Sequence, residues 1–132
     1  MPIFQLTESL SVAAQITPQD IPNLAAQGFT VVVCNRPDGE VPGQATMDEI
    51  EAACNAADLL FVRYPVDAMN FPGPDIEGLG ALFDDPGQSV LAYCRTGTRC
   101  ANLWVTSQTG ETQAAAVQAA RDIGFDLSLV RA

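Results

Sequence analysis

The sequence predicts an α/β fold, with a mainly parallel sheet of four to five strands flanked by helices. Short apolar runs rich in β-branched residues alternate with helical patterns along the chain. These runs are almost continuously apolar, as expected of parallel strands that are covered on both faces. The chain has 132 residues, 48% of them hydrophobic, so a single domain over residues 1–132 is expected.

The first expected elements are a strand and a capped helix. The segment SVAAQI predicts a short strand over residues 11–16. Thr17 is typical of a helix N-cap, Pro18 after it is a favoured first helical residue, and Gly28 is a common stop. These signals predict a helix over residues 17–28.

A buried strand, a loop and a second helix follow. FTVVVCN predicts a strand over residues 29–35, and the Pro- and Gly-rich RPDGEVPGQA predicts a loop after it. Thr46 and Glu49 form a capping-box signature ahead of an apolar stripe, which predicts a helix over 47–58. LLFVRYPV then predicts a strand over 59–66.

The second half of the chain repeats this alternation. DAMNFPGPD is a Pro- and Gly-rich loop, and SVLAYC is an apolar strand that runs directly into RTGTR. CANLWVTSQ and the Ala-rich ETQAAAVQAARDIG carry helical patterns. The expected elements are a helix over 76–83, a strand over 89–94, and helices over 100–108 and 111–124.

The charge of the chain limits its expected partners. A formal net charge of -10 repels nucleic acid and anionic membrane surfaces, so neither is an expected partner. No apolar run approaches the ~20 residues of a membrane span, and the N-terminus lacks the blocks of a signal peptide. We therefore expect no membrane insertion and a cytoplasmic location.

All 6 positive residues of the chain are arginines. Arginine offers a planar fork of donors to oxyanions, so arginines that lie together form a local anion site in an acidic protein. Loops that follow parallel strands share the carboxyl edge of the sheet. The sequence therefore predicts that Arg36, Arg95 and Arg99 meet at that edge, with Arg63 nearby, and that Arg36 and Arg95 steer or bind an anionic substrate.

The stretch LAYCRTGTRC carries the strongest chemical signal. A cysteine at a strand end, followed by a Gly-containing turn into a helix, lies among N–H groups that favour the thiolate. Cys94 is the expected nucleophile, and Arg99 is the expected clamp for an anionic substrate. Gly97 permits the turn, and the hydroxyls of Thr96 and Thr98 are expected to bind the sulfur or the anion. The alternative is a core cysteine beside a surface arginine.

These residues resemble known families. YCRTGTR resembles the active-site loop of rhodanese-like sulfurtransferases, whose cysteine carries a persulfide. AQITPQDIPNLAAQGFTVVVCNRPDGE and FVRYPVD, with the cysteine loop, resemble the scaffold of dual-specificity and related cysteine phosphatases. The combination, over roughly residues 10–125, resembles the phosphatase-like domain of β-lactamase hydrolase-like proteins, domain of unknown function 442 (DUF442). That family occurs alone or joined to a metallo-β-lactamase-type domain linked to sulfide and persulfide oxidation.

Loop length separates the two chemistries that the resemblance implies. Cysteine phosphatases use Cys-x5-Arg to wrap three phosphoryl oxygens, whereas this chain has Cys-x4-Arg. One residue fewer removes one N–H donor and about 3.3 Å of contour, which favours a terminal sulfur over a phosphoryl group. Tyr93 also stands where those phosphatases usually place a histidine. Asp67, in contrast, matches the position of their general acid; a loop aspartate that caps a turn is the alternative.

The residues and the resemblance together predict a sulfurtransferase. Cys94 is expected to take sulfur from thiosulfate or a small persulfide and to pass it to a thiol or cyanide. The alternatives are a cysteine phosphatase with Asp67 as general acid and a non-catalytic module that binds persulfides or anions. The expected partner is a small anion: thiosulfate, glutathione persulfide or a phosphate ester.

The family also implies a link to a persulfide dioxygenase or to a sulfide:quinone oxidoreductase pathway. No cofactor is expected. Because the chain contains no histidine, no metal site is expected either.

The other cysteines each have two interpretations. The resemblance implies that Cys34 lies close to Cys94, where a reversible disulfide would protect the thiolate; a buried strand cysteine is the alternative. Cys100 is either a resolving or sulfur-accepting thiol or a packing residue. Cys54 lies on the apolar stripe of its helix and is expected in the core.

Overall fold

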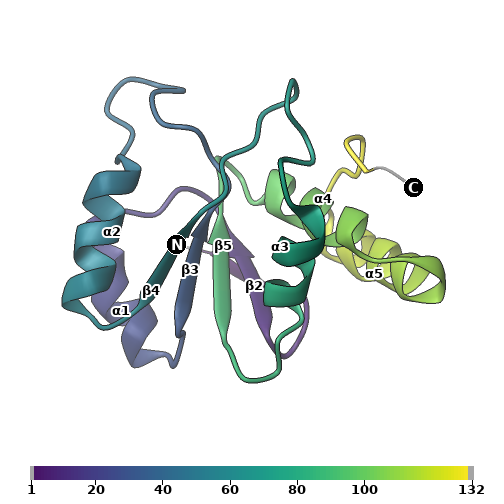
Figure 1. Cartoon of the computed structure of the whole chain (residues 1–132), viewed down its shortest axis with the longest axis horizontal. Coiled ribbons are helices and arrows are strands. Elements are labelled where there is room, and N and C mark those ends of the chain that lie inside the picture. The colour runs from purple at the N-terminus through teal and green to yellow at the C-terminus, as the bar shows by residue number, and fades with distance from the viewer. Residues whose placement is uncertain (1, 131–132) are drawn as a thin grey trace.

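The computed structural model describes residues 2–130 and places a five-stranded sheet between two layers of helices (Figure 1). The order across the sheet is β1-β2-β5-β3-β4. Only β1 is antiparallel, because it pairs with β2 through a short connection, and the other neighbours are parallel. The bounds are β1 Ile3–Gln5, β2 Leu10–Ala13, β3 Val31–Cys34, β4 Leu60–Arg63 and β5 Val90–Tyr93. The predicted α/β fold class is confirmed.

The strands are shorter than their apolar runs predicted. β4 ends at Arg63 although the pattern extends to Val66, because Pro65 has no N–H to continue the ladder. The backbone N–H groups of Tyr64 and Val66 still bond to the β3 side, at Cys34 O and Asn35 O. The edge strand β1 was not predicted, since its three residues carry no readable alternation.

The helices begin and end close to their predicted limits. Their bounds are α1 Ile21–Ala26, α2 Met47–Ala56, α3 Ile76–Phe83, α4 Thr98–Ser107 and α5 Gly110–Ile123. The expected helix over 17–28 begins with a separate 3-10 turn, Pro18–Asp20, behind the Thr17 capping box. α4 begins two residues before the predicted Cys100, because Gly97 in the left-handed region (φ 89°) caps it.

Two cores cover the two faces of the sheet, as the layers in Figure 1 show. Successive residues of β5 alternate between them. Val90 and Ala92 pack on the side of α3, α4 and α5, together with Cys94, whereas Leu91 and Tyr93 pack on the side of α1 and α2. The central strand is therefore buried on both faces, as its continuous hydrophobicity predicted.

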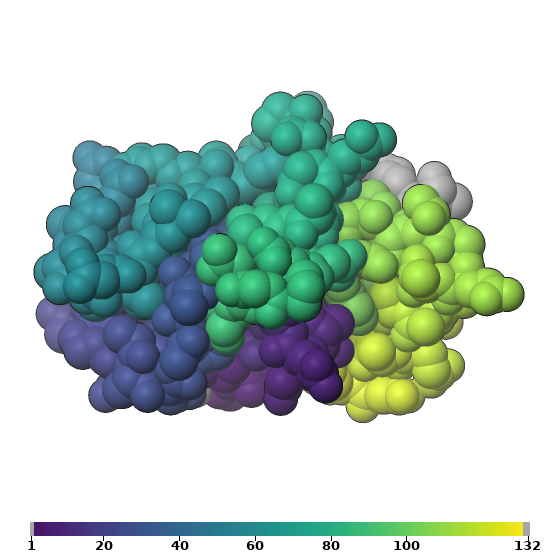
Figure 2. Space-filling model, turned by 60° about the horizontal axis from the view of Figure 1, so that its bottom comes forward, coloured from purple at the N-terminus to yellow at the C-terminus, as the bar shows by residue number. Residues whose placement is uncertain are grey.

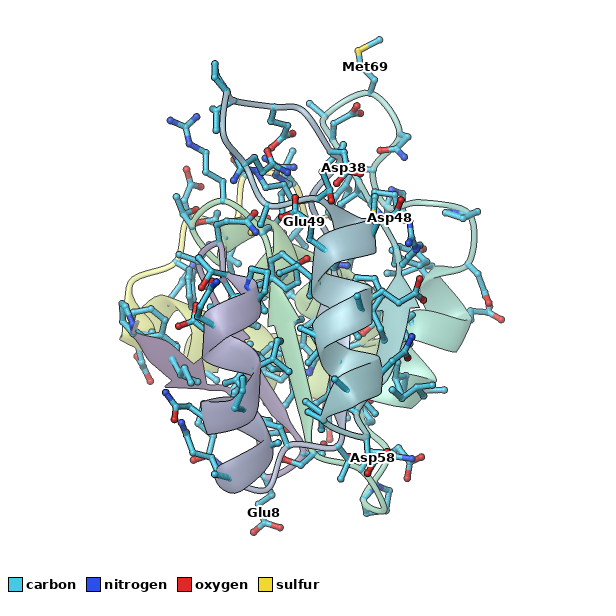
Figure 3. The ribbon with its side chains drawn as sticks, turned by 90° about the vertical axis from the view of Figure 1, so that its left-hand side faces the viewer. Glu8, Asp38, Asp48, Glu49, Asp58 and Met69 are labelled. Atoms are coloured by element: carbon cyan, nitrogen blue, oxygen red, sulfur yellow. The ribbon has the colours of Figure 1, made fainter. Side chains whose placement is uncertain are left out.

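The long loops gather at the carboxyl ends of the parallel strands. In Figure 3, Met69 marks the tip of the loop after β4, and Asp38 lies in the neighbouring loop after β3. Glu8 and Asp58 mark the opposite end of the sheet. That opposite end is turned forward in Figure 2, where residues 84–89 (green) lie against N-terminal residues (purple).

The C-terminal segment packs back on α4. Asn102, fully buried in that helix, donates from Nδ2 to Asp126 O (2.7 Å) and accepts from Leu129 N (3.0 Å). The second Nδ2 hydrogen bond, to Thr98 O (2.8 Å), reaches the first turn of the helix. The segment after α5 is therefore attached to the helix that carries the cysteine loop. No helix within residues 2–130 is long and apolar enough to cross a membrane.

Candidate active site around Cys94

Cys94 lies directly after β5, at the junction with α4. Its side chain is 1% exposed and packs on the α3, α4 and α5 side of the sheet. Gly97 turns the chain into the helix, and a Cβ there would lie 3.4 Å from the Phe125 ring. The left-handed backbone favours glycine at the turn, whereas the Phe125 ring lies at an ordinary van der Waals distance.

The Cys94 sulfur is surrounded by hydrogen-bond donors. The thiol of Cys100 donates to it, and so do the backbone amides of Cys100, Thr96 and Arg99. The amide of Gly97 donates to Sγ at 3.1 Å. Burial favours the neutral thiol, but these donors outweigh it and lower the pKa of Cys94 to about 6. Cys94 is therefore largely a thiolate at neutral pH.

Cys100 supplies the largest of these effects. It is fully buried in the first turn of α4, and burial together with the neighbouring Cys94 thiolate raises its pKa well above its ordinary value. Cys100 thus keeps its proton while Cys94 loses its own. The structure brings the two thiols together, and a resolving or sulfur-accepting role for Cys100 stays a prediction beside its packing in the core.

Arg99 is held from two sides. Its Nη1 donates to Glu40 Oε2 (2.9 Å) and to Val66 O (2.9 Å), and its Nη2 donates to Glu40 Oε1 (2.7 Å). Burial lowers the pKa of Arg99, but Glu40 and the Cys94 thiolate raise it by more, so it carries its charge next to the sulfur.

Arg36 donates to the same carboxylate as Arg99, that of Glu40. It is 3% exposed and donates from Nε to Glu40 Oε1 (2.8 Å) and from Nη1 to Gln15 Oε1 (3.1 Å). The predicted meeting of Arg36 and Arg99 at the carboxyl edge is therefore observed, through Glu40. The sequence did not point to Glu40; the signal that would have found it is its place four residues after Arg36 in RPDGE.

The remaining predicted anion-binding residues lie at the rim. Thr96 Oγ1 donates to Thr98 Oγ1 (3.0 Å), and both the Thr96 and Arg95 side chains are exposed. Arg63 does not join the site. It pairs instead with Asp48 and Glu51 on α2, at 2.7 and 3.0 Å, because β4 is the edge strand farthest from β5 on that side.

Asp67 caps its own turn. Its Oδ1 accepts from the backbone N–H groups of Met69 (2.8 Å) and Asn70 (3.1 Å), and its own N–H donates to Asn70 Oδ1 (2.7 Å). The residue is exposed, and its second oxygen has no hydrogen-bond partner among the described residues. One oxygen thus builds the loop while the other faces solvent.

Cys34 packs on the other face of the sheet from Cys94. It is in register with Tyr93 and belongs to the core under α1 and α2. Its thiol donates to Arg36 O (3.1 Å), and burial raises its pKa. A disulfide between Cys34 and Cys94 would therefore need both side chains to turn toward one another. Cys54 lies buried in the α2 stripe, as predicted.

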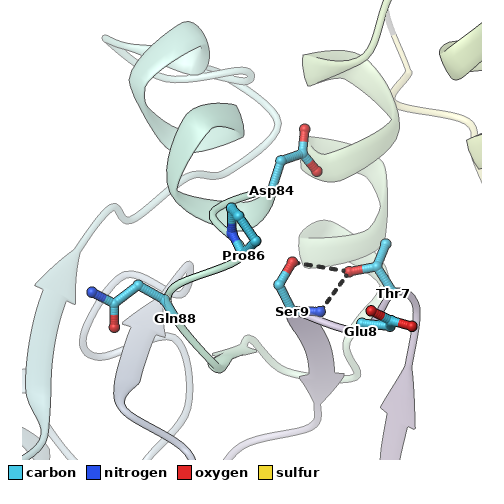
Figure 4. Close-up of a pocket in the computed structure, with 6 residues that line it drawn as sticks. All are labelled: Thr7, Glu8, Ser9, Asp84, Pro86 and Gln88. Atoms are coloured by element: carbon cyan, nitrogen blue, oxygen red, sulfur yellow. Dashed lines mark hydrogen bonds between the residues drawn. The ribbon is translucent and has the colours of Figure 1, made fainter.

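Two surface hollows differ in their relation to this site. One of about 460 Å³ is lined by Arg36, by Glu49 and by residues 15–19 and 41–45. The other, of about 500 Å³, lies at the opposite end of the sheet and is drawn in Figure 4. Glu8 and Asp84 line it, and none of the predicted site residues does. Arg36 is the predicted site residue that lines the first hollow; Cys94 and Arg99 do not line it.

A family model and a curated relative both match most of the chain. The model of the family described as "Beta-lactamase hydrolase-like protein, phosphatase-like domain" matches residues 3–112. The "Beta-lactamase hydrolase-like protein" of Agrobacterium fabrum is 32% identical over 130 residues, which are 96% of this chain and 30% of that protein. The chain therefore spans less than a third of that curated relative.

Solved structures share the fold. A "putative phosphatase" from Neisseria meningitidis is 33% identical, with a TM-score of 0.73 over 92% of this chain and 89% of that one. PTPMT1 is 17% identical, with a TM-score of 0.70 over 91% and 82% of the two chains. The second likeness concerns the fold alone.

Proposed function

The chain belongs to the family of phosphatase-like domains of β-lactamase hydrolase-like proteins, and we propose that it is a cysteine-dependent enzyme that transfers a group from a small oxyanion to Cys94. The observation that carries this proposal is the buried Cys94 sulfur, which has a pKa of about 6 and lies among inward-pointing N–H groups beside Arg99. The reaction favoured by the fold and by the phosphatase relatives is hydrolysis of a phosphate monoester.

Phosphate ester hydrolysis takes two steps at this site. The Cys94 thiolate attacks phosphorus, the bond to the ester oxygen breaks, and the leaving oxygen takes up a proton. Water then attacks the phosphocysteine, which releases phosphate and restores the thiolate. Arg99 and the loop amides would bind the phosphoryl oxygens, and Arg36 lines the hollow that would hold the rest of the ester. Asp67 is the candidate proton donor through its solvent-facing oxygen.

Sulfur transfer is the second candidate, and two observations favour it. The loop is Cys-x4-Arg, one residue shorter than the phosphatase loop, and its amides converge on the Cys94 sulfur itself. In addition, Asp67 uses one oxygen to cap its turn, and sulfite leaves thiosulfate without a general acid. The thiolate would attack the outer sulfur of thiosulfate, the S–S bond would break, and an acceptor thiolate would then take that sulfur.

The same chemistry suggests the partners of the second candidate. A glutathione-type persulfide would serve as donor or product, and an enzyme that oxidises persulfides, or a sulfide-oxidising pathway, would supply or consume it. A binding module that holds the anion without turning it over is the remaining candidate. It predicts sulfur or anion binding at Cys94 with no product.

One experiment separates these functions. The protein and Cys94→Ser are incubated with an aryl phosphate, with thiosulfate plus cyanide, and with glutathione persulfide, and turnover and intact mass are recorded. Phosphate release that depends on Cys94 supports the phosphatase. Thiocyanate formation and a mass gain of one sulfur at Cys94 support the transferase instead. If Cys94→Ser turns over any of these as fast as the wild type, the proposed role of Cys94 is wrong.

A further inference from the structure

Glu40 bridges two arginines of the site, Arg36 and Arg99. Its two carboxylate oxygens accept three hydrogen bonds, two from Arg99 and one from Arg36, at 2.7 to 2.9 Å. Its side chain is 24% exposed, so the bridge lies at the rim of the site. Arg99 in turn holds the backbone after β4 through Val66 O. Glu40 thus connects the loop after β3 with the cysteine loop.

The atoms in these contacts show which edge of Arg99 is used. A guanidinium has two forks: the end, formed by Nη1 and Nη2, and the side, formed by Nε and Nη2. Glu40 takes the end fork with both oxygens, and Val66 O takes the other Nη1 hydrogen. Within residues 2–130, no hydrogen bond uses Nε. The hydrogens of the side fork therefore have no hydrogen-bond partner among the described residues.

The charges explain why Glu40 stays in place. The Arg36 side chain is 3% exposed, and Glu40 is its carboxylate partner. Removing that partner would leave a buried charge uncompensated, which is strongly destabilising in proteins. The hydrogen bonds from Arg99 and Arg36 hold the pKa of Glu40 below its ordinary value, so it is ionised throughout the range in which Cys94 titrates.

We propose that Glu40 is a positioning residue, which fixes the end fork of Arg99 so that its side fork faces an anion bound at Cys94. This inference deepens the proposed function, because it needs an anion site at Cys94 but not a particular reaction. It differs from an inhibitory contact, in which Glu40 would occupy Arg99 in place of the substrate. The two interpretations predict opposite effects of removing the Glu40 carboxylate on the affinity of the site for an anion.

The test measures anion binding without turnover. Sulfate is the probe, because its charge is constant between pH 5 and 9, and its affinity is read from the protection of Cys94 against iodoacetamide. The variants are Glu40→Gln and the matched control Glu51→Gln, which removes a carboxylate paired with Arg63 outside the site. The pH midpoint of Cys94 alkylation is measured in each variant as a readout that is independent of sulfate.

The expected result is about a tenfold loss of sulfate affinity in Glu40→Gln, with no rise in the alkylation midpoint and no change in Glu51→Gln. A gain in affinity would overturn the proposal in favour of an inhibitory contact. Unchanged affinity would assign Glu40 a structural role only. If sulfate fails to protect wild-type Cys94, the proposed anion site and this inference both fail, whereas normal protection without any turnover counts against the proposed reactions alone.

A second pair of variants covers the case in which Glu40→Gln does not fold. Arg36→Met replaces the buried charge with an apolar chain of similar length, and Arg36→Met/Glu40→Gln then lacks the carboxylate without leaving Arg36 unpaired. Sulfate affinity is compared between these two proteins. A further loss in the double variant supports positioning of Arg99 by Glu40, and equal affinities would overturn it.

Discussion

Two regions of this protein each bury a cysteine almost completely, but they shift the pKa of the thiol in opposite directions. Cys94 at the end of β5 is 1% exposed and Cys54 in the middle of α2 is 0% exposed. Burial raises the pKa of Cys54 to about 11, whereas the pKa of Cys94 falls to about 6. Burial therefore does not decide reactivity here. The donors that face the sulfur do.

The difference follows from where each cysteine lies in its element. In the middle of α2 the backbone N–H groups are already bonded within the helix, and none is available to a side chain. Cys94 precedes α4, whose first N–H groups have no partner inside the helix. A strand-to-helix junction thus converts unpaired backbone donors into stabilisation of a thiolate.

The largest effect is expected from exchanging the nucleophile. Cys94→Ser should lower turnover of the active substrate about 10³-fold or more, because a serine hydroxyl is not ionised by the same donors. Cys54→Ser should keep most of the activity. Steady-state kinetics of both variants check this, and a comparable loss in Cys54→Ser would remove the contrast between the two regions.

The free energy of unfolding should also depend on pH, because the fold lowers the pKa of Cys94. The folded-state pKa of Cys94 lies below its ordinary value of 9.0. Between about pH 6 and pH 9 the Cys94 thiol is therefore protonated in the unfolded chain and ionised in the folded protein. The free energy of unfolding should therefore rise with pH across that window, by up to about 4 kcal/mol. The chain has no histidine to obscure the effect.

Urea denaturation of the wild type and Cys94→Ser at several pH values measures this contribution. The difference in unfolding free energy between the two proteins should shrink as the pH falls toward 6. A difference that does not vary with pH would mean that Cys94 is protonated in the folded protein.

A smaller effect is expected from changing the shape of the cation. Arg99→Lys keeps the charge, but an ammonium group cannot bond to Glu40 and to an anion through two separate forks. We expect kcat/KM to fall about 10²-fold while the alkylation midpoint of Cys94 stays near 6. Arg63→Lys, which changes the arginine paired with α2, is the control and should leave kcat/KM unchanged.

The smallest expected effect concerns the neighbouring thiol. Cys100→Ala removes the donor with the largest influence on Cys94 and should raise the midpoint of its alkylation by about one pH unit. Cys100→Ser retains an O–H donor and should restore most of the shift. If both variants behave as the wild type, the backbone amides alone account for the low pKa.

The sequence was informative where local signals agree with the fold. The limits of α3 match the predicted 76–83, and the capping box of Thr46 and Glu49 begins α2 as expected. The β-branched run at Val31–Cys34 predicted a strand buried on both faces. The rule that parallel strands share a carboxyl edge predicted that Arg36 and Arg99 lie together, and both donate there to Glu40.

What the sequence missed depends on loop conformation and on which face a side chain takes. Glu40 meets Arg99 only because the loop after β3 folds back on itself, and no period or spacing links residues 59 positions apart. The resemblance implied that Cys34 lies close to Cys94. The charge of Cys94 does act on the pKa of Cys34, but the alternation of β3 and β5 sends the two side chains to opposite faces of the sheet. Arg63 was expected near the anion site, but it forms ion pairs from the edge strand β4 to Asp48 and Glu51 of α2 instead.

The attachment of the C-terminal segment to Asn102 has a practical consequence for work on this protein. A version shortened after Gly124 would take from the Asn102 amide its hydrogen bonds with Asp126 and Leu129 and leave it the one to Thr98 O. It would also uncover Gly97 by removing the Phe125 ring. A truncation chosen to tidy the end of the chain would thus loosen the reactive loop, and a loss of activity in such a fragment would say nothing about the chemistry of Cys94.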